Sequence, residues 1–277
     1  MADLGKMRYF LGVEMRQTEQ GICKGDFGEI WYAGLQSCQK NPCVPGTLLS
    51  KEGVNEVDGT VYKQLVGCLM YLTVTLPDLM YTVCLILRYM SNPKEEHMLI
   101  AKRALSYLKG TLDFGLMYQR EAKMNVVAYT DSDYARDMDD RKSISGYVFL
   151  FNGSAVCWSS HKQAIVTSSS TKAEYVAATS CACHCVWVKG ILGQMNCICC
   201  RCITILCDNS SAIKLSKNPV MHRRTKHIDV RFHYLRDLVN DGVVELSFCA
   251  SEEQVADIMT KPLSLDQFVK LRRSLGV

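Results

Sequence analysis

The chain has 277 residues, of which 48% are hydrophobic, and its formal net charge is +4. This hydrophobic content is enough for a packed core, so intrinsic disorder is not the default expectation for the chain. The charge permits nucleic-acid binding without demanding it, and the length fits one large domain or two ordinary ones.

The composition and the first residues indicate the compartment. There are fifteen cysteines, and charged residues interrupt the first positions, where a secretory signal would be apolar. We expect reduced thiols and an intracellular protein, cytoplasmic or nuclear and not secreted. The longest apolar stretch, 65–87, has Pro77 and Asp78 in its middle, which is unfavourable for a membrane span. We therefore expect no membrane partner.

The first 120 residues are predicted to mix strands and helices. The expected elements are a hairpin at 7–23, a short helix at 28–36, two helices within 60–91, an amphipathic helix at 97–109 and a strand at 115–118. Pro77 fits an early helix position in the second of the paired helices. Gly110 fits the C-cap of the amphipathic helix.

A polar, charged run at 119–123 is interpreted as a linker, because strands and helices alternate beyond it. The expected elements are strands at 125–131, 145–151 and 155–159, a helix at 171–192, a strand at 203–207, helices at 210–217 and 226–240, a strand at 243–249, and helices at 252–261 and 265–275. Asn152 and Gly153 are a strong hairpin signal, since both tolerate positive φ. The order predicts an α/β domain with a mixed sheet.

Four acidic residues adjoin the predicted buried elements, and each has an ordinary structural explanation. Asp131 fits the start of a turn. Glu174 fits a capping box that begins at Thr171. Asp208 fits the N-cap of the helix that follows it, and Asp257 fits the first turn of a helix, where a negative charge is favourable.

Taken together, the four acids predict a metal site. Two follow strands and two lie in first helical turns next to strands, and such positions converge at one edge of an α/β sheet. Clustered carboxylates raise one another's pKa unless cations neutralise them. Oxygen ligands of this kind favour Mg²⁺, with Mn²⁺ as the alternative, over zinc. A pair of such ions is the arrangement used for in-line phosphodiester cleavage.

Motifs along the chain carry a more specific signal. In the second half they are 129–135, 139–147, 158, 162–163, 171–175, 207–213, 225–229 and 256–262, including Tyr-Thr-Asp-Ser-Asp, Thr-Lys-Ala-Glu and Ala-Asp-Ile-Met-Thr-Lys-Pro. In this order they resemble the RNase H domain of copia-type LTR retrotransposon Pol polyproteins. Motifs at 3–5, 9–12, 72–73, 77–78, 101–103 and 107–111 resemble the end of the reverse transcriptase region of the same family.

The resemblance implies a domain order and a reaction. Residues 1–120 would be a small α+β remnant of the reverse transcriptase, thumb-like or connection-like. Residues 124–265 would be an RNase H domain, with a mixed five-stranded sheet flanked by helices, and 266–277 a helical tail. Asp131, Glu174, Asp208 and Asp257 would be the catalytic metal ligands. Two Mg²⁺ ions would serve endonucleolytic hydrolysis of the RNA strand of an RNA–DNA hybrid.

Residues near the acids are candidates for binding that hybrid. The candidate substrate contacts are Ser169, Ser170, Asn209, Arg223, Arg224 and Lys226. The first three flank the acids, and helix capping is the alternative interpretation for them. The last three lie in a basic segment suited to phosphates, for which a solvated surface is the alternative.

Other features leave alternatives open. The Tyr-x-Asp-Asp hairpin of a polymerase is absent, so we expect no DNA polymerase activity, and the missing palm or other element proteins are expected partners. The cysteines at 181–185 and 197–202 lack finger-like spacing, which favours free thiols over structural zinc. One alternative function is a catalytically idle, truncated element relic that at most binds nucleic acid. Another is an integrase-type nuclease with three acids that acts on DNA.

Overall fold

The computed structural model describes residues 9–10, 13–18, 21–25, 38–53, 55–119, 125–195, 202–217 and 229–277. The chain divides into two compact units. One comprises Met1–Ala122, Asn152–Ala155 and Pro262–Val277, and the other Lys123–Phe151 and Val156–Lys261. The helix expected at 28–36 and most of the linker expected at 119–123 lie outside the described residues. The expected domain boundaries stay a prediction.

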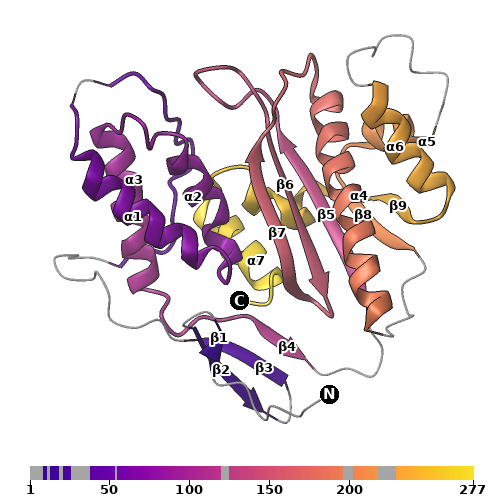
Figure 1. Cartoon of the computed structure of the whole chain (residues 1–277), viewed down its shortest axis with the longest axis horizontal. Helices are drawn as coiled ribbons and strands as arrows, with labels where there is room; N and C mark the ends of the chain where they lie inside the picture. Colours follow the sequence, from indigo (N-terminus) through magenta and orange to yellow (C-terminus); the bar gives the residue numbers. More distant parts are fainter. Residues whose placement is uncertain are drawn as a thin grey trace. The chain divides into compact units, whose positions relative to one another are not determined.

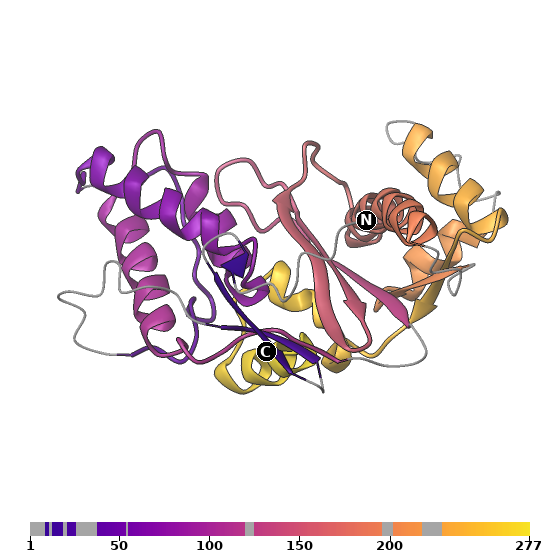
Figure 2. The same ribbon diagram turned by 60° about the horizontal axis from the view of Figure 1, so that its bottom comes forward.

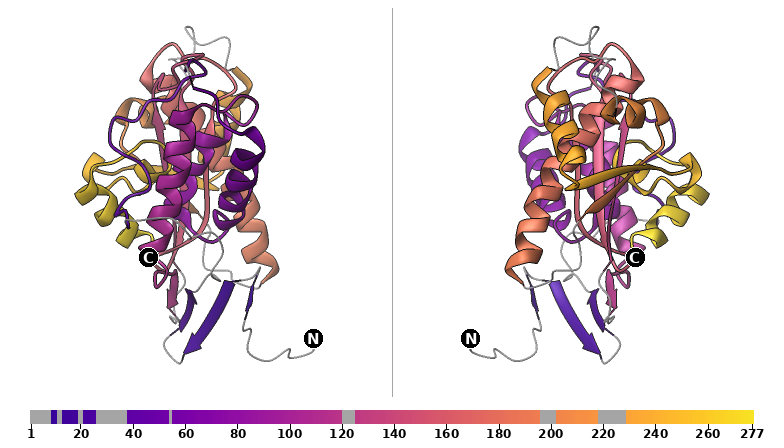
Figure 3. Two further views of the ribbon diagram at one scale, coloured as in Figure 1. Left: turned by 90° about the vertical axis from the view of Figure 1, so that its left-hand side faces the viewer. Right: turned by 90° about the vertical axis from the view of Figure 1, so that its right-hand side faces the viewer.

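The first unit contains a small antiparallel sheet, visible in both views of Figure 3. Its strands are β1 (Tyr9–Phe10), β2 (Val13–Thr18), β3 (Gly21–Gly25) and β4 (Met117–Gln119), in that order. The hairpin of β2 and β3 confirms the expected pairing. β4 joins it from far along the chain, since Ile22 pairs with Tyr118.

Helices make up the rest of this unit. They are α1 (Gly59–Leu72), the 3₁₀ turn η1 (Pro77–Leu79), α2 (Met80–Leu87) and α3 (Glu95–Lys109). Asp58 caps α1, because its Oδ1 accepts a hydrogen bond from the backbone N–H of Thr60 at 2.8 Å. Pro77 begins η1, so the long apolar stretch is broken as the sequence predicts. Gly110 is the C-cap of α3.

The C-terminal helix α7 (Leu265–Ser274) confirms the last expected element and belongs to the first unit. Its Phe268 meets Tyr107 of α3 edge-on, with ring centroids 5.7 Å apart. Arg272 donates a hydrogen bond from Nη1 to the hydroxyl of Tyr107 at 3.1 Å. That hydroxyl in turn donates to Asp78. A buried polar chain therefore ties α7 to η1 and α3.

The second unit is built on a five-stranded mixed sheet, the large sheet of Figure 1. Its strands are β5 (Val126–Asp133), β6 (Ile144–Phe151), β7 (Ser154–Lys162), β8 (Ile203–Cys207) and β9 (Val244–Phe248). Their spatial order is β7-β6-β5-β8-β9. β5 pairs with β6 antiparallel and with β8 parallel, and β8 pairs with β9 parallel. This order confirms the expected RNase H-like α/β fold.

The helices of the second unit are α4 (Ser170–Gln194), α5 (Ser210–Lys217) and α6 (Asp229–Asn240). α4 lies along the sheet and is seen nearly end-on in Figure 2. Its buried residues, such as Ala178 and Cys181, share one core with Ala128 and Ile205 of the strands. By length and composition α4 could cross a membrane, but half of its apolar window is buried within the fold. Core helices meet the same criteria.

The helix expected at 252–261 is wrong. The structure has two short 3₁₀ turns there, η4 (Ser251–Glu253) and η5 (Val255–Met259). Gln254 separates them, because its backbone is extended, with ψ at 95°. Its side chain accepts a hydrogen bond from the N–H of Ala256 and so caps η5.

Candidate metal centre

Two of the predicted acids come from neighbouring parallel strands. Asp131 lies within β5, two residues before its end, rather than at the end as expected. Asp208 directly follows β8. Tyr129 pairs with Leu206, so two more residues along both strands bring Asp131 level with Asp208. The parallel register therefore places both carboxylates at the same edge of the sheet.

Glu174 comes from α4, and its contact replaces the capping box that the sequence allowed. The N-cap of α4 is Ser169, whose hydroxyl accepts a hydrogen bond from the N–H of Lys172 at 3.3 Å. The capping box from Thr171 is therefore wrong, and Glu174 lies in the second helical turn, not the first. Its Oε1 accepts a hydrogen bond from the N–H of Ser132 in β5 at 3.2 Å. Glu174 is thus directed at the strand that carries Asp131.

Asp208 is not the cap of the following helix either. The neighbouring Asn209 has that role, because its Oδ1 accepts a hydrogen bond from the N–H of Ala212 at 2.9 Å. Asp208 Oδ2 instead accepts a hydrogen bond from the hydroxyl of Ser251 at 2.9 Å. Since Ser251 begins η4, this bond fixes the segment that leads to the fourth acid.

Asp257 reaches the site in η5, and a glycine makes room for that turn. Gly146 of β6 pairs with Asp131, so the two residues share a face of the sheet. A Cβ on Gly146 would lie 2.6 Å from Cβ of Met259 and 2.8 Å from Cγ2 of Thr260. The absence of a side chain at Gly146 therefore lets η5 lie against the sheet beside Asp131.

Two residues after η5 contact the acids directly. The hydroxyl of Thr260 donates a hydrogen bond to Oδ2 of Asp131. Lys261 Nζ lies 2.9 Å from Oδ1 of Asp257 and 3.7 Å from Oδ2 of Asp131. One ammonium group therefore bridges two of the four predicted acids.

The acids are close enough to affect one another's ionisation. Burial raises the pKa of Asp131, against the lowering effects of Lys261 and of the Thr260 hydrogen bond. Burial, and then the charges of Asp131 and Asp208, raise the pKa of Glu174 well above its usual value. Burial and the charge of Asp131 raise the pKa of Asp257 to about 7. Burial lowers the pKa of Lys261, but the charges of Asp131 and Asp257 act in the opposite direction, and the pKa is raised overall.

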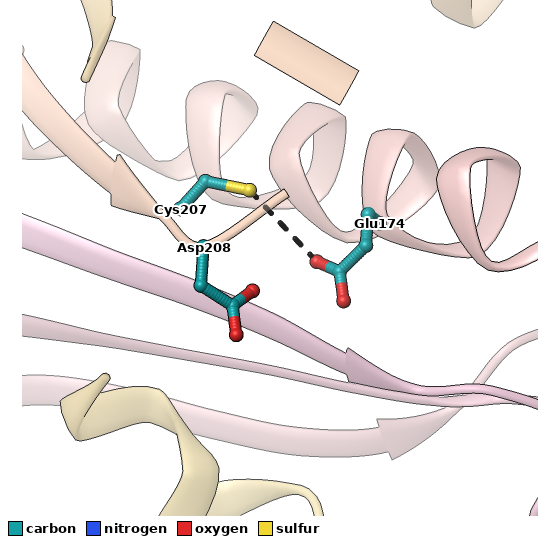
Figure 4. A group of neighbouring side chains, drawn as sticks. All are labelled: Glu174, Cys207 and Asp208. Atoms are coloured by element: carbon teal, nitrogen blue, oxygen red, sulfur yellow. Dashed lines mark hydrogen bonds between the residues drawn. The ribbon is translucent and has the colours of Figure 1, made fainter. Parts of the chain in front are cut away.

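A thiol also lies among the carboxylates. The ligand atoms of Glu174, Cys207 and Asp208 all lie within 4.8 Å of one another. Figure 4 shows these three side chains as neighbours. Cys207 Sγ donates a hydrogen bond to Oε2 of Glu174 at 3.9 Å. Burial and the charge of Glu174 raise the pKa of this thiol. In the absence of a bound cation, both effects favour the protonated thiol of Cys207.

The donor chemistry fits a divalent cation. Asp131, Glu174 and Asp257 are buried and Asp208 is half-buried, and buried carboxylates are unfavourable unless positive charge compensates them. Among the residues that the structure describes, one lysine, Lys261, forms ion pairs with this cluster. Hard carboxylate oxygens are the ligands that Mg²⁺ and Mn²⁺ prefer. The four acids could hold such ions, because one ammonium group compensates only part of the negative charge of four carboxylates.

The predicted substrate contacts are only partly described. Ser169 caps α4 and Asn209 caps α5, so both have the helix-capping role that was the alternative interpretation. Ser170 is the first residue of α4. Arg223, Arg224 and Lys226 lie outside the described residues. Contact of these residues with nucleic acid stays a prediction.

Three residues that lie in the sequence motifs, but were not predicted to belong to the site, hold it together. Gln163 is buried and donates hydrogen bonds from Nε2 to the hydroxyls of Ser132 and Ser145 and to the carbonyl oxygen of Ala173. It therefore joins β5, β6 and the start of α4. The other two are Thr260 and Lys261. Lys261 had a visible signal, since it follows Asp257 by four residues, a spacing that suits ion pairs on a helical turn.

The chain resembles known polyproteins over nearly its whole length. It is 33% identical to "Retrovirus-related Pol polyprotein from transposon RE1" of Arabidopsis thaliana, over 99% of this chain and 19% of that protein. It is 37% identical to "Retrovirus-related Pol polyprotein from transposon TNT 1-94" of Nicotiana tabacum, over 88% of this chain and 18% of that protein. It thus spans about a fifth of these relatives. No family model matches the chain.

Solved structures show weaker likenesses. The N-terminal RNase H domain of rv2228c from Mycobacterium tuberculosis is 13% identical, covers 55% of this chain and 99% of its own, and gives a TM-score of 0.36. LC11-RNase H1 in complex with RNA/DNA hybrid is 13% identical, covers 49% of this chain and 94% of its own, and gives a TM-score of 0.33. At these scores the fold assignment rests on the strand order of the second unit.

Proposed function

The chain belongs to the family of retrovirus-related Pol polyproteins from copia-type transposons, and on this basis we propose that its second unit is a ribonuclease H. The proposed reaction is endonucleolytic hydrolysis of the RNA strand of an RNA–DNA hybrid. The proposed cofactor is a pair of Mg²⁺ ions, which Mn²⁺ can replace.

One observation carries the proposal: four carboxylates from four separate segments meet at one edge of the sheet. Asp131 comes from β5, Glu174 from α4, Asp208 from the end of β8 and Asp257 from η5. Lys261 bridges Asp131 and Asp257, and the ligand atoms of Glu174 and Asp208 lie within 4.8 Å of each other. Convergence of this kind is unfavourable without cations, so it supports a selected metal site rather than four unrelated surface acids.

The residues have distinct roles in the proposed reaction. When bound, the cations lower the pKa of the attacking water and stabilise charge on the leaving 3′ oxygen. Asp131, in the central strand, would anchor the metal site on the rigid sheet. Glu174 would be held in place by the N–H of Ser132, and Asp208 by the hydroxyl of Ser251. Discrimination for RNA would come from 2′-hydroxyl contacts and from the shape of the hybrid.

Partners and location follow as further proposals. The hybrid is the proposed substrate, and the basic segment with Arg223, Arg224 and Lys226 is proposed to bind its phosphates. The polymerase palm of the family and other element proteins are proposed protein partners. We keep an intracellular location, cytoplasmic or nuclear, as the proposal that goes with reduced cysteines.

The test is Mg²⁺-dependent cleavage of a hybrid with labelled RNA, compared between the unmodified chain and Asp131→Asn. We expect cleavage by the unmodified chain, none in EDTA, and at least about a 100-fold loss in the variant, since even an indirect metal contact is worth 10–100-fold. No cleavage by a folded unmodified chain would leave the idle relic as the better description. Cleavage of duplex DNA instead would favour the integrase-type alternative.

A further inference from the structure

Lys261 places a positive charge where a metal ion would be expected. Its Nζ lies 2.9 Å from Asp257 Oδ1 and 3.7 Å from Asp131 Oδ2. The two carboxylate side chains are 9% and 3% exposed, whereas the lysine side chain is 32% exposed. The ammonium group therefore reaches the buried acids from the solvent side of the site.

The backbone holds Lys261 in this position. Its N–H donates a hydrogen bond to the carbonyl oxygen of Asp257 at 3.2 Å, and the N–H of Thr260 donates to the same oxygen at 3.1 Å. The Thr260 hydroxyl is bonded to Asp131. The contact is therefore built by the turn that follows η5, and not by a freely moving surface lysine.

The two halves of the site are compensated differently. Asp131 and Asp257 share the lysine. Among the described residues, neither Glu174 nor Asp208 forms an ion pair with a lysine or arginine. Glu174 is instead bonded to a backbone N–H and a thiol, and Asp208 to a hydroxyl. Neutral donors compensate charge less than a cation does, so this half keeps the greater need for a metal ion.

We propose that Lys261 is a built-in counter-ion of the Asp131–Asp257 pair, and that a divalent cation binding to this pair must displace its ammonium group. The inference rests on the proposed function only in taking these two acids as metal ligands. The proposal predicts that two divalent ions bind with unequal affinity. The first binds at Glu174 and Asp208 without displacing a charge. The second competes with Lys261 and is the weaker, so Lys261 sets the cation concentration at which the site is filled.

The test is a calorimetric titration of Mn²⁺ into the metal-free chain, without nucleic acid. Lys261→Met removes the charge and keeps an unbranched side chain. We expect it to tighten the weaker class of Mn²⁺ sites by at least about tenfold, which corresponds to about 1.4 kcal/mol. Lys261→Arg keeps the charge and should not tighten binding. Asp257→Asn should remove the weaker class and so identify it.

Lys162→Met is the matched control. Lys162 also bridges two carboxylates of the second unit, with Nζ 3.1 Å from Asp137 Oδ2 and 3.0 Å from Asp140 Oδ2. Lys162→Met removes two ion pairs, as Lys261→Met does, but these pairs involve Asp137 and Asp140 and not the four predicted metal ligands. We expect its Mn²⁺ affinity to be unchanged. A general effect of losing lysine ion pairs would appear in both variants.

Thermal melting gives a second measurement and also shows whether Lys261→Met folds. In EDTA, Lys261→Met should melt at a lower temperature than the unmodified chain, because two buried acids lose their cation. Saturating Mn²⁺ should raise its melting temperature by more than it raises that of the unmodified chain. The inference is overturned if Lys261→Met binds the weaker ion no more tightly than the unmodified chain, or if Lys261→Arg tightens it equally.

These outcomes are separable from those of the cleavage assay. A chain whose Mn²⁺ affinity responds to Lys261→Met but which cleaves no hybrid would refute the ribonuclease proposal alone. If the chain cleaves hybrid with Mg²⁺ but Lys261→Met leaves its Mn²⁺ affinity unchanged, only the counter-ion proposal is refuted.

Discussion

The side-chain amide of Gln254 donates a hydrogen bond to the backbone carbonyl oxygen of Thr130 at 3.0 Å, across 124 residues of chain. Gln254 is fully buried and its Oε1 accepts from the N–H of Ala256. One side chain therefore both caps η5 and attaches it to β5, next to Asp131. The position of Asp257 relative to Asp131 depends on this residue.

Replacing Gln254 by Leu should loosen that attachment. A buried carbonyl oxygen and the N–H of Ala256 would lose their partner, which costs about 1–3 kcal/mol. We expect this loss in the free energy of unfolding by urea, together with weaker Mn²⁺ binding. Gln194→Leu is the control, since Gln194 is exposed at the end of α4, and its effect should stay within about 0.5 kcal/mol. Equal losses for both variants would contradict the attachment role.

Gly146→Ala tests the packing of η5 against the sheet. The added Cβ would meet Met259 and Thr260 at distances that no relaxed structure tolerates, so the turn must move away from Asp131. We expect a loss of about 1–3 kcal/mol in stability and weaker metal binding. Gly190→Ala is the matched control, because Gly190 is an exposed position of α4 and a Cβ there meets nothing within 4 Å. It should stabilise the chain by up to about 1 kcal/mol, so effects of the same sign would refute the account.

The metal-free chain should lose stability as pH rises from about 5 to 8. The pKa of Asp257 is about 7 in the folded chain, above the ordinary aspartate value of 3.8. The folded state therefore holds this proton more tightly than the unfolded state, and the stabilisation it gives is lost as pH rises through 7. The pKa values of Asp131 and Glu174 are raised in the same direction. The expected loss is on the order of a few kcal/mol.

Urea unfolding in EDTA at several pH values measures this loss. Saturating Mg²⁺ should reverse the trend, because metal ligands must be deprotonated. Asp257→Asn should reduce the slope and so separates its contribution from those of histidines. If the free energy of unfolding in EDTA rose between pH 5 and 8, the raised pKa values of these acids in the folded chain would be contradicted.

Arg272→Met should loosen the first unit. Arg272 donates to Tyr107, whose hydroxyl donates to buried Asp78, and its guanidinium lies 4.4 Å from the centroid of the Phe114 ring. Removing one member of such a buried network costs about 3 kcal/mol. We expect faster hydrogen–deuterium exchange in α3 and α7, measured by mass spectrometry. Arg273→Met, at the exposed neighbouring position, should leave exchange unchanged, and similar exchange in both variants would contradict the role of Arg272.

Much of the second unit could be predicted from local patterns. The strand Ile203–Cys207 and the helix Ser210–Lys217 have the predicted bounds, because each is a short apolar or amphipathic run with clear ends. The turn at Asn152 and Gly153 has positive φ at both residues, as expected. Where a pattern is local and has one solution, the sequence was sufficient.

Local patterns failed where several solutions were available. Residues 167–171 are all Thr or Ser, so each is an acceptable N-cap, and nothing local distinguishes Ser169, the actual N-cap of α4, from Thr171. Glu174 was ambiguous for the same reason. At 252–261 the residues favour a helix, but the long-range bond of Gln254 to Thr130 keeps the backbone extended between two 3₁₀ turns.

The candidate site shows the same division. The four acids were found because their types and order resemble a known pattern. The roles of Gly146, Gln163 and Lys261 were not predicted, because each depends on a contact with a segment distant in sequence. The i,i+4 spacing of Asp257 and Lys261 signals their own ion pair but not the contact of Lys261 with Asp131. Scaffold residues of this kind are visible only when the segments are placed in space.

The position of η5 late in the chain has a consequence for biosynthesis. A ribosome produces Asp131, Glu174 and Asp208 well before Asp257, so the nascent domain first holds an incomplete set of acids. The last carboxylate and its compensating ammonium group then emerge together, since Lys261 follows Asp257 by a single turn. Closing the site during synthesis therefore adds a carboxylate and an ammonium group together, which leaves the formal charge at this edge of the sheet unchanged.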